Sequence, residues 1–142
     1  MRKSPATQIL DPLSKVRSIC LALPETYEKE AWGGPTFRVR KGKMFVMYVN
    51  NHHGDGILGI WCAAPLGAQA MLIDLDPDRF FKPPYVGVNG WVGVRLDRAV
   101  DWTEVASLIE DGYRSAVPKR GFSSPNESGK HAKLRRLNAK PK

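Results

Sequence analysis

Helical and strand-type hydrophobic patterns occupy different parts of this sequence, and their order restricts the fold more than any other feature. Apolar residues recur every three or four positions over residues 12–22, after an Asp-Pro pair suited to a helix N-terminus. A second helix is predicted for residues 102–116, where Asp101 and Glu104 have the spacing of a capping box. The segments between these helices are short and β-prone. Strands flanked by helices predict an α+β domain in which helices pack on one side of an antiparallel sheet.

A first β-hairpin is predicted to turn at residues 41–42. Residues 37–40 alternate strictly between apolar and basic side chains, and residues 44–49 continue as β-prone sequence. With a two-residue turn, Arg40 faces Lys43. One side of the hairpin tip then carries the basic residues Arg38, Arg40 and Lys43, and the other side carries the apolar residues Phe37, Val39 and Met44. The sequence therefore predicts a cationic face at this tip.

Three further elements are predicted after this hairpin. Residues 57–62 form a strand, and residues 65–72 form a short helix that ends at a cluster of Asp and Pro. The Asn-Gly pair at 89–90 is the strongest short hairpin signal, because both residue types tolerate positive φ. A second hairpin is therefore predicted to join residues 85–88 to residues 91–96.

Positive charge is concentrated near the C-terminal end of the sequence. The formal net charge is +8, and residues 118–142 hold eight basic residues and one acid. Residues 1–117 hold 14 basic and 13 acidic residues and are close to neutral. A chain of this length suits one core. We therefore expect a single domain over residues 1–117, followed by a basic tail over residues 118–142 that is disordered in isolation because its composition buries little apolar surface.

The sequence also indicates where the protein resides. No window approaches the roughly 20 apolar residues that a membrane helix needs, and the N-terminal residues are polar instead of forming an apolar signal. Cys20 and Cys62 lie in apolar surroundings without a CxxC pair, which favours free thiols. We expect a cytoplasmic protein with no membrane association.

Motifs for catalysis, metals and cofactors are weak. Residues 54–59 match G-x-G-x-x-G, but a strand follows where the dinucleotide fingerprint needs a helix. His52 and His53 lie beside Asp55, but adjacent residues of an extended segment point to opposite sides. Neither cysteine has a base near it in sequence. No cofactor or metal is expected, and catalysis is less favoured than binding, although spatial neighbours are not visible in a sequence.

Tryptophan side chains could fill the core or line a groove. Trp32, Trp61, Trp91 and Trp102 are bulky enough to dominate a small core. Trp32 and Trp91 adjoin glycines and lie near a proline or another aromatic residue. This setting suggests a groove formed by Trp32, Pro35, Tyr85 and Trp91, with core packing as the alternative.

Several short motifs carry a family resemblance. They are LPET at 23–26, EAWGGPTFRV at 30–39, GKMF at 42–45, PPYVG at 83–87, GWV at 90–92 and GYR at 112–114. With these motifs in order, the sequence resembles the MmcQ/YjbR family over about residues 13–119. The resemblance implies an antiparallel sheet with helices packed on it, an arrangement similar to frataxin or secretion chaperones. It also implies DNA as a partner, because the family is commonly labelled DNA-binding.

Two binding hypotheses follow, with a small-molecule site or enzyme as a third. In the first, basic side chains contact the phosphates of DNA or of another polyanion. These are Arg38, Arg40, Lys41 and Lys43 at the hairpin tip, with Lys133, Arg135 and Arg136 in the tail. In the second, the aromatic groove binds a protein or peptide, as in an adaptor. The hairpin charges and the family label together favour the first.

Overall fold

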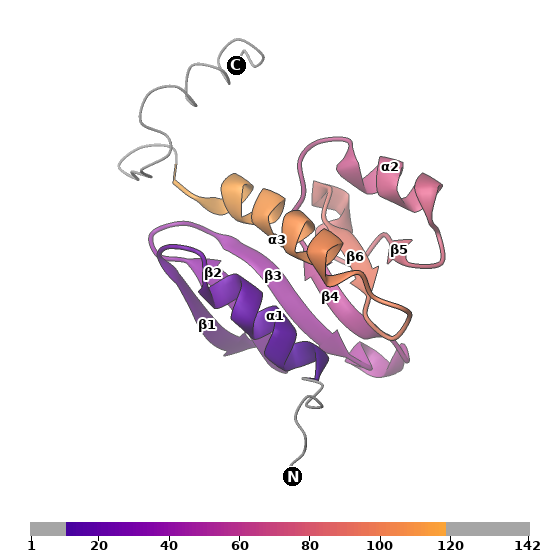
Figure 1. Ribbon diagram of the computed structural model, residues 1–142, viewed down its shortest axis with the longest axis horizontal. Helices are drawn as coiled ribbons and strands as arrows, with labels where there is room; N and C mark the ends of the chain where they lie inside the picture. The colour runs from indigo at the N-terminus through magenta and orange to yellow at the C-terminus, as the bar shows by residue number, and fades with distance from the viewer. Residues whose placement is uncertain (1–10, 119–142) are drawn as a thin grey trace.

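Six antiparallel strands form one sheet in the described part of the chain, in the order β1-β2-β3-β4-β6-β5. The computed structural model describes residues 11–118 (Figure 1). The strands are β1 (Thr26–Ala31), β2 (Gly34–Val39), β3 (Met44–Asn50), β4 (Leu58–Cys62), β5 (Phe80–Phe81) and β6 (Val92–Arg95). The helices are α1 (Pro12–Leu21), α2 (Ala68–Leu75) and α3 (Trp102–Ala116), with 3₁₀ turns η1 (His52–Gly54) and η2 (Val86–Asn89). The predicted α+β class is confirmed.

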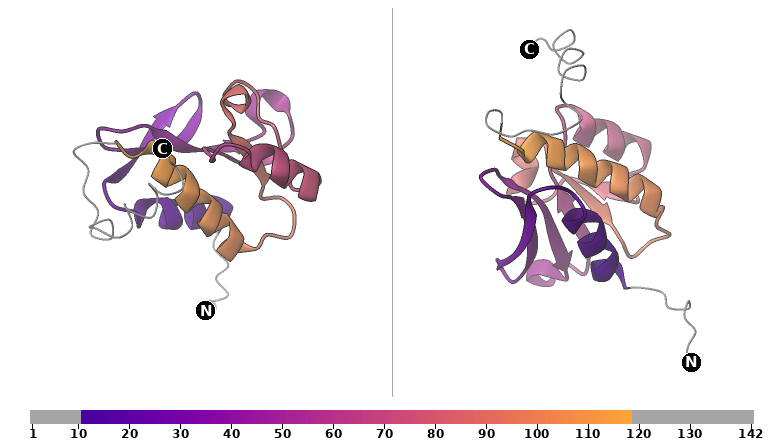
Figure 2. Two further views of the ribbon diagram at one scale, coloured as in Figure 1. Left: turned by 90° about the horizontal axis from the view of Figure 1, so that it is seen from above. Right: turned by 60° about the vertical axis from the view of Figure 1, so that its left-hand side comes forward.

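Helices α1 and α3 lie side by side on one face of the sheet (Figures 1 and 2). Helix α3 contacts β2, β3 and β4, α1 contacts β1 and β3, and α2 lies beside the edge strand β5. The predicted packing of helices on one side of an antiparallel sheet is therefore confirmed. We call the sheet face opposite α1 and α3 the outer face.

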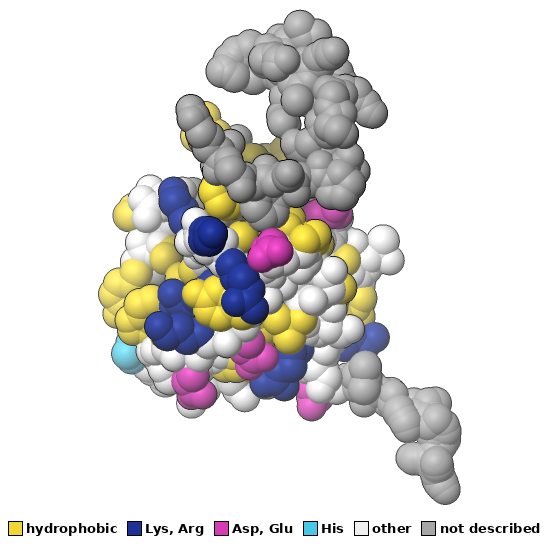
Figure 3. Space-filling view, turned by 90° about the vertical axis from the view of Figure 1, so that its left-hand side faces the viewer, with side chains coloured by type: hydrophobic (Ala, Val, Ile, Leu, Met, Phe, Trp, Pro, Cys, Tyr) yellow, Lys and Arg dark blue, Asp and Glu magenta, His cyan; other side chains and the backbone are white. Residues whose placement is uncertain are grey.

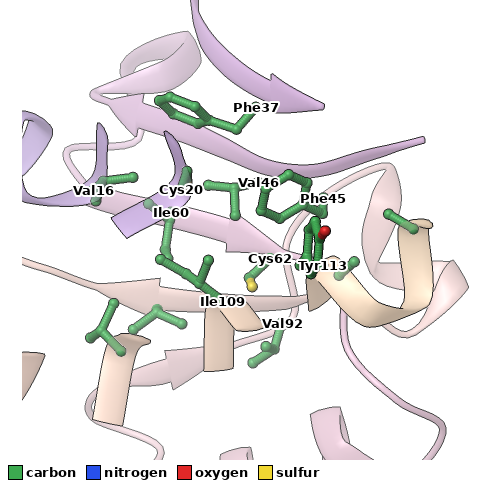
Figure 4. Close-up of a cluster of buried hydrophobic side chains, with 14 of the residues drawn as sticks. Val16, Cys20, Phe37, Phe45, Val46, Ile60, Cys62, Val92, Ile109 and Tyr113 are labelled. Atoms are coloured by element: carbon green, nitrogen blue, oxygen red, sulfur yellow. The ribbon is translucent and has the colours of Figure 1, made fainter. Parts of the chain in front are cut away.

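The core fills the layer between the sheet and these two helices (Figure 4). Its labelled side chains are Phe37, Phe45, Val46, Ile60, Cys62 and Val92 from the sheet, and Val16, Cys20, Ile109 and Tyr113 from the helices. All are buried. Removing this apolar surface from water supplies most of the driving force for the fold.

A β-bulge adjusts β3 to this core. Phe37 of β2 pairs with Val46, and the next residue, Arg38, pairs with Met44, so Phe45 is the extra residue between them. Phe45 and Val46 are both fully buried in the main core, although neighbours on a regular strand point to opposite faces. Met44 therefore pairs with Arg38. The expectation that Met44 shares a side with Phe37 and Val39 was wrong.

The two predicted helix N-termini are confirmed by their caps. Asp11 accepts a hydrogen bond from the backbone N–H of Ser14 (2.8 Å), and Asp101 accepts from Thr103 (3.1 Å) and Glu104 (3.3 Å). These carboxylates satisfy amides that have no partner within the helix. The Glu104 carboxylate departs from the capping-box arrangement, since it accepts from the Arg79 guanidinium at 2.6 Å.

Other sequence expectations differ from the structure. The second hairpin was wrong, because residues 86–89 form η2 and β6 pairs with β4 and β5 instead. Strands β1 and β5 were not predicted. The short helix expected at 65–72 begins later, at Ala68, and extends to Leu75.

One hydrogen bond joins the last helix to the connection between α1 and β1. The Tyr113 hydroxyl donates to the backbone carbonyl of Pro24 at 2.8 Å, while the Tyr113 ring packs edge-on against Phe45. We expect Tyr113→Phe to keep the ring contact and lower the free energy of unfolding by about 1 kcal/mol. Urea unfolding of both proteins measures this difference, and equal midpoints and slopes would contradict it.

A bidentate ion pair fastens β1 to α1. The Arg17 guanidinium donates from Nε and Nη2 to the two carboxylate oxygens of Glu28, at 2.8 and 2.9 Å. These hydrogen bonds lower the pKa of Glu28, against a smaller opposing effect of burial. A carboxylate with a lowered pKa in the folded state stabilises the fold above its unfolded pKa, and this contribution is lost as the pH falls.

We therefore expect Glu28→Gln to be less stable than the parent at pH 7. The difference in stability between Glu28→Gln and the parent should disappear as the pH falls from about 4.3, the ordinary pKa of glutamate, through the lowered pKa of Glu28. Thermal unfolding across pH measures it. Glu30, which forms no ion pair within residues 11–118, supplies the control substitution Glu30→Gln, and the same pH dependence in both variants would refute the role of Arg17.

Candidate nucleic-acid interface

The outer face divides into a covered half and an exposed half. Over β3 and β4, Met47, Val49 and Trp61 form a second buried cluster, against which Phe81, Val86 and Trp91 pack. Over β1 and β2 the outer face is partly open, since Lys29 is exposed and Tyr27 and Arg38 are half-buried, while Thr36 is buried. The β1–β2 register brings Tyr27 opposite Arg38 and Lys29 opposite Thr36 there.

Arg38 is held in place on this exposed half. Its Nε donates to the Thr36 hydroxyl at 3.0 Å, and its guanidinium carbon lies 5.8 Å from the centroid of the Trp32 ring. The Thr36 hydroxyl in turn donates to the backbone carbonyl of Lys29. No carboxylate of the described residues forms an ion pair with Arg38. Its remaining N–H donors can therefore serve a ligand.

The β2–β3 turn is longer than predicted. The Val39 N–H donates to the Lys43 carbonyl at 3.0 Å, so three residues lie between them, and Arg40 does not face Lys43. The two-residue turn was wrong, and with it the argument that placed Lys43 on the side of Arg38. The Arg40 guanidinium lies 5.6 Å from the centroid of the Tyr27 ring, which shares the outer face with Arg38.

The hairpin tip is fixed to the rest of the fold. The Lys43 N–H donates to the Ala116 carbonyl at the end of α3, and the Arg40 N–H donates to the Glu25 carbonyl. A Cβ on Gly42 would lie 2.4 Å from that Ala116 oxygen, so only glycine allows this approach. Lys41 and Lys43 are exposed at the tip.

Most arginines elsewhere in the described residues are tightly ion-paired, with Arg98, 3.6 Å from Asp78, as the exception. Arg17, Arg79, Arg95 and Arg114 each have a carboxylate oxygen within about 3 Å. Arg40 has only Glu25, at 3.9 Å and largely exposed to solvent. In Figure 3, dark blue Lys and Arg side chains alternate with yellow hydrophobic ones on the side of the molecule that carries β1 and β2. Weakly paired cations thus lie among aromatic rings.

Trp32 occupies an unusual turn. It forms with Gly33 the two-residue connection between β1 and β2, and both have positive φ, 52° and 83°. Turns of this kind favour Asn-Gly, because a bulky residue at positive φ is strained. The Trp32 side chain is nevertheless 64% exposed. Burial therefore does not offset the strain at this position.

Tyr85, like Trp32, combines a strained backbone with an exposed side chain. Its φ and ψ are 63° and −73°, and the Val86 N–H donates to the Pro84 carbonyl across it. This is a γ-turn of the rare, strained form. The Tyr85 side chain is 69% exposed, and its ring lies edge-on to that of His53 at 6.4 Å between centroids.

A hollow of about 270 Å³ lies beside Trp32. Its walls are formed by the Trp32 turn, the end of β3 and η1, and its lining residues include Trp32, Tyr48, Asn50, Asn51, His52 and His53. His52 is placed by its ring contact with the buried Trp61, at 5.1 Å between centroids. His53 thus lines the hollow and also contacts the Tyr85 ring. Trp32, the two histidines and Tyr85 therefore form a continuous row at one end of the sheet.

The four residues expected to form one groove lie in different settings. Trp91 is partly buried and packs against both core clusters, and its carbonyl accepts from the Gln69 side chain. Pro35 pairs with Glu30 and lies two residues before Phe37 on β2. Its side chain therefore points to the same face as Phe37, toward the helices. Trp32 and Tyr85 are exposed. The tail residues Lys133, Arg135 and Arg136 lie outside the described residues.

Sequence reasoning missed Tyr27, Lys29 and the two histidines as parts of this surface. Tyr27 and Lys29 were missed because β1 was not predicted, since TYEKEA lacks the apolar alternation that indicates a strand. His52 and His53 were expected to point to opposite sides, but in the folded chain their ring centroids lie 4.2 Å apart and both rings lie beside aromatic side chains.

Residues 11–118 offer few groups suited to catalysis or metal binding. Burial raises the pKa of both Cys20 and Cys62, to about 12 for Cys62, so neither is poised as a nucleophile. No group of three or more potential metal-binding side chains occurs there. In the same part of the chain, every helix is too short or too polar to cross a membrane.

Comparisons with known proteins agree with the fold. The family model described as YjbR matches residues 21–115. The chain belongs to the YjbR family. The crystal structure of Deinococcus radiodurans protein DR2400, with the family-model domain DUF419, is similar at a TM-score of 0.63 and 22% identity, over 80% of this chain and 83% of that chain. This likeness shows a shared fold. A comparison with curated proteins gives no match.

The Trp32 turn of this YjbR-family chain yields a stability prediction. Trp32→Asn restores the Asn-Gly pair that such a turn favours, so we expect the free energy of unfolding to rise by about 1 kcal/mol. Trp91→Ala, which removes a packed ring, should lower it by about 2 kcal/mol or more. Urea unfolding measures both. A Trp32→Asn protein that is clearly less stable than the parent would mean that the Trp32 ring supports the fold.

Proposed function

We propose that this chain binds nucleic acid through the exposed half of its outer face and the hairpin tip. The observation that carries the proposal is the pairing pattern of the arginines. Arg38 and Arg40 lie on one accessible surface without a tight carboxylate partner, whereas arginines elsewhere in the described residues are mostly engaged. Cations in this state are available for phosphate groups.

The neighbouring aromatic rings support a nucleic acid over a simple polyanion. Trp32 stands against Arg38 and Tyr27 against Arg40, so each cation is held beside a flat apolar surface. Interleaved cations and aromatic rings suit a ligand in which phosphates alternate with planar bases. DNA is the partner that the family label suggests, and the chemistry of this surface accepts RNA as well.

The remaining parts of the proposal concern the tail and the location. Lys133, Arg135 and Arg136 of the basic tail at 118–142 would add affinity without sequence preference through counterion release, beside a domain ending near residue 117. Two buried free thiols suit a reducing cytoplasm.

A peptide-binding adaptor is the alternative. Trp32 and Tyr85 are exposed enough to anchor a peptide, but Trp91 and Pro35 are partly buried and do not extend their surface into a continuous groove. The aromatic rings alone would fit this alternative. The weakly paired cations beside them favour nucleic acid.

The test is a salt-dependent titration of full-length protein with labelled duplex and single-stranded DNA. We expect Arg38→Gln/Arg40→Gln to weaken binding on the order of tenfold and to reduce the slope of log affinity against log salt by about two. Fluorescence anisotropy between about 50 and 200 mM salt measures both quantities.

Two further variants complete the test. Arg95→Gln/Arg114→Gln changes the charge equally at arginines that have a carboxylate within about 3 Å, and should leave affinity and slope nearly unchanged. Lys133→Gln/Arg135→Gln/Arg136→Gln measures how much the tail contributes to affinity. Equal losses of affinity in the two double-arginine variants, or binding that depends on the tail alone, would contradict a role of the outer face in binding.

A further inference from the structure

We infer that the nucleic acid held by this surface is single-stranded, with one unpaired base stacked on Trp32 at the hollow and Tyr85 offering a second stacking position. The inference rests on the proposed function and specifies the form of its ligand. It starts from two large aromatic side chains that are mostly exposed while their backbones are held at strained, positive φ.

Neither ring is explained by stability. Trp32 and Tyr85 lie outside both buried clusters, so they contribute little to the core. Strained backbone conformations persist where the surrounding structure imposes them, and they cluster at functional sites. The β1–β2 register imposes the Trp32 turn, and the Pro84–Val86 hydrogen bond closes the turn at Tyr85. The backbone at both residues is thereby fixed, while their rings are exposed to solvent.

The hollow has dimensions and chemistry that suit a base. At about 270 Å³ it is slightly smaller than typical pockets for drug-sized ligands, roughly 300–1,000 Å³. Trp32 provides an aromatic face, while Asn50, His52 and His53 provide groups that can hydrogen bond to the edge of a base. The Asn51 side chain already accepts from the Gly56 N–H.

The charges continue away from the hollow along the outer face. Arg38 lies against Trp32, and Arg40 lies against Tyr27, the cross-strand neighbour of Arg38. A base stacked on Trp32 therefore has cations beside it for the phosphates that follow in the strand.

A duplex cannot use these rings in the same way. Its bases are paired and stacked inside, and protein side chains reach only their edges and the phosphates. Exposed rings beside cations contribute binding energy only when a base is free to lie on them. The juxtaposition of Trp32, the hollow and Arg38 thus favours an unpaired strand.

The experiment uses full-length protein and three probes with equal numbers of phosphates per strand. They are a single-stranded dT oligomer, the corresponding abasic strand that lacks every base, and the dT·dA duplex. We expect the dT strand to bind more tightly than the abasic strand and the duplex, and to quench tryptophan fluorescence. A Trp32→Phe protein should keep most of the affinity and lose most of the quenching.

Trp32→Asn isolates the stacking contribution. It should weaken binding of the dT strand roughly 5- to 150-fold, leave binding of the abasic strand unchanged, and fold at least as stably as the parent. Tyr85→Gly should act in the same direction with a smaller effect. The abasic probe is the matched control, because it keeps the phosphates that Arg38 and Arg40 contact.

The outcomes separate this inference from the proposed function. Equal affinity for the dT and abasic strands, or tighter binding of the duplex, with no effect of Trp32→Asn, overturns the single-strand inference and leaves nucleic-acid binding intact. Failure of all three probes to bind overturns both. A loss of dT binding in Trp32→Asn that appears equally with the abasic strand also overturns the stacking role.

Discussion

The sheet is covered by α1 and α3 on one face only, and the candidate interface depends on this asymmetry. Successive side chains of a strand point to opposite faces. Phe37 and Val39 enter the core, so Arg38 between them faces outward. The bulge that adds Phe45 to the core changes β3 without turning Arg38 around. The packing that stabilises the fold therefore also sets where the cation lies.

Anchoring makes this surface suited to binding. The β2–β3 tip is tied by backbone hydrogen bonds to Ala116 and Glu25, and Arg38 is tied to Thr36. Groups that are already ordered lose less conformational freedom when a ligand arrives. Lysine and arginine side chains on a mobile loop would lose more. Most of the conformational entropy of the interface is thus lost during folding, before a ligand binds.

Much of the fold could be predicted from the sequence, because its core elements carry periodic apolar side chains and caps such as Asp11 and Asp101. Strand β1 could not, since its inward residues Thr26 and Glu28 are polar and are satisfied by the Cys20 carbonyl and by Arg17. The Asn-Gly pair at 89–90 misled because residues before it form η2 instead of a strand. The basic residues of the interface were visible in the sequence. Trp32 and Tyr85 were visible too, as candidate groove residues. Tyr27, His52 and His53 were not, because β1 was not predicted and η1 lies beside the Trp32 turn only in the folded chain.

A fold shared at 22% identity does not specify a ligand, so function has to be argued from the site. At Trp32 the local sequence conflicts with the residue preference of its turn. Trp32 stands where a turn favours asparagine or glycine, and its ring is left in water. Its cation–π contact with Arg38 is worth only about 0.5–1 kcal/mol at an exposed site, no more than the strain at positive φ. A residue that gains so little for the fold is best explained by what the ring contacts when a ligand is bound.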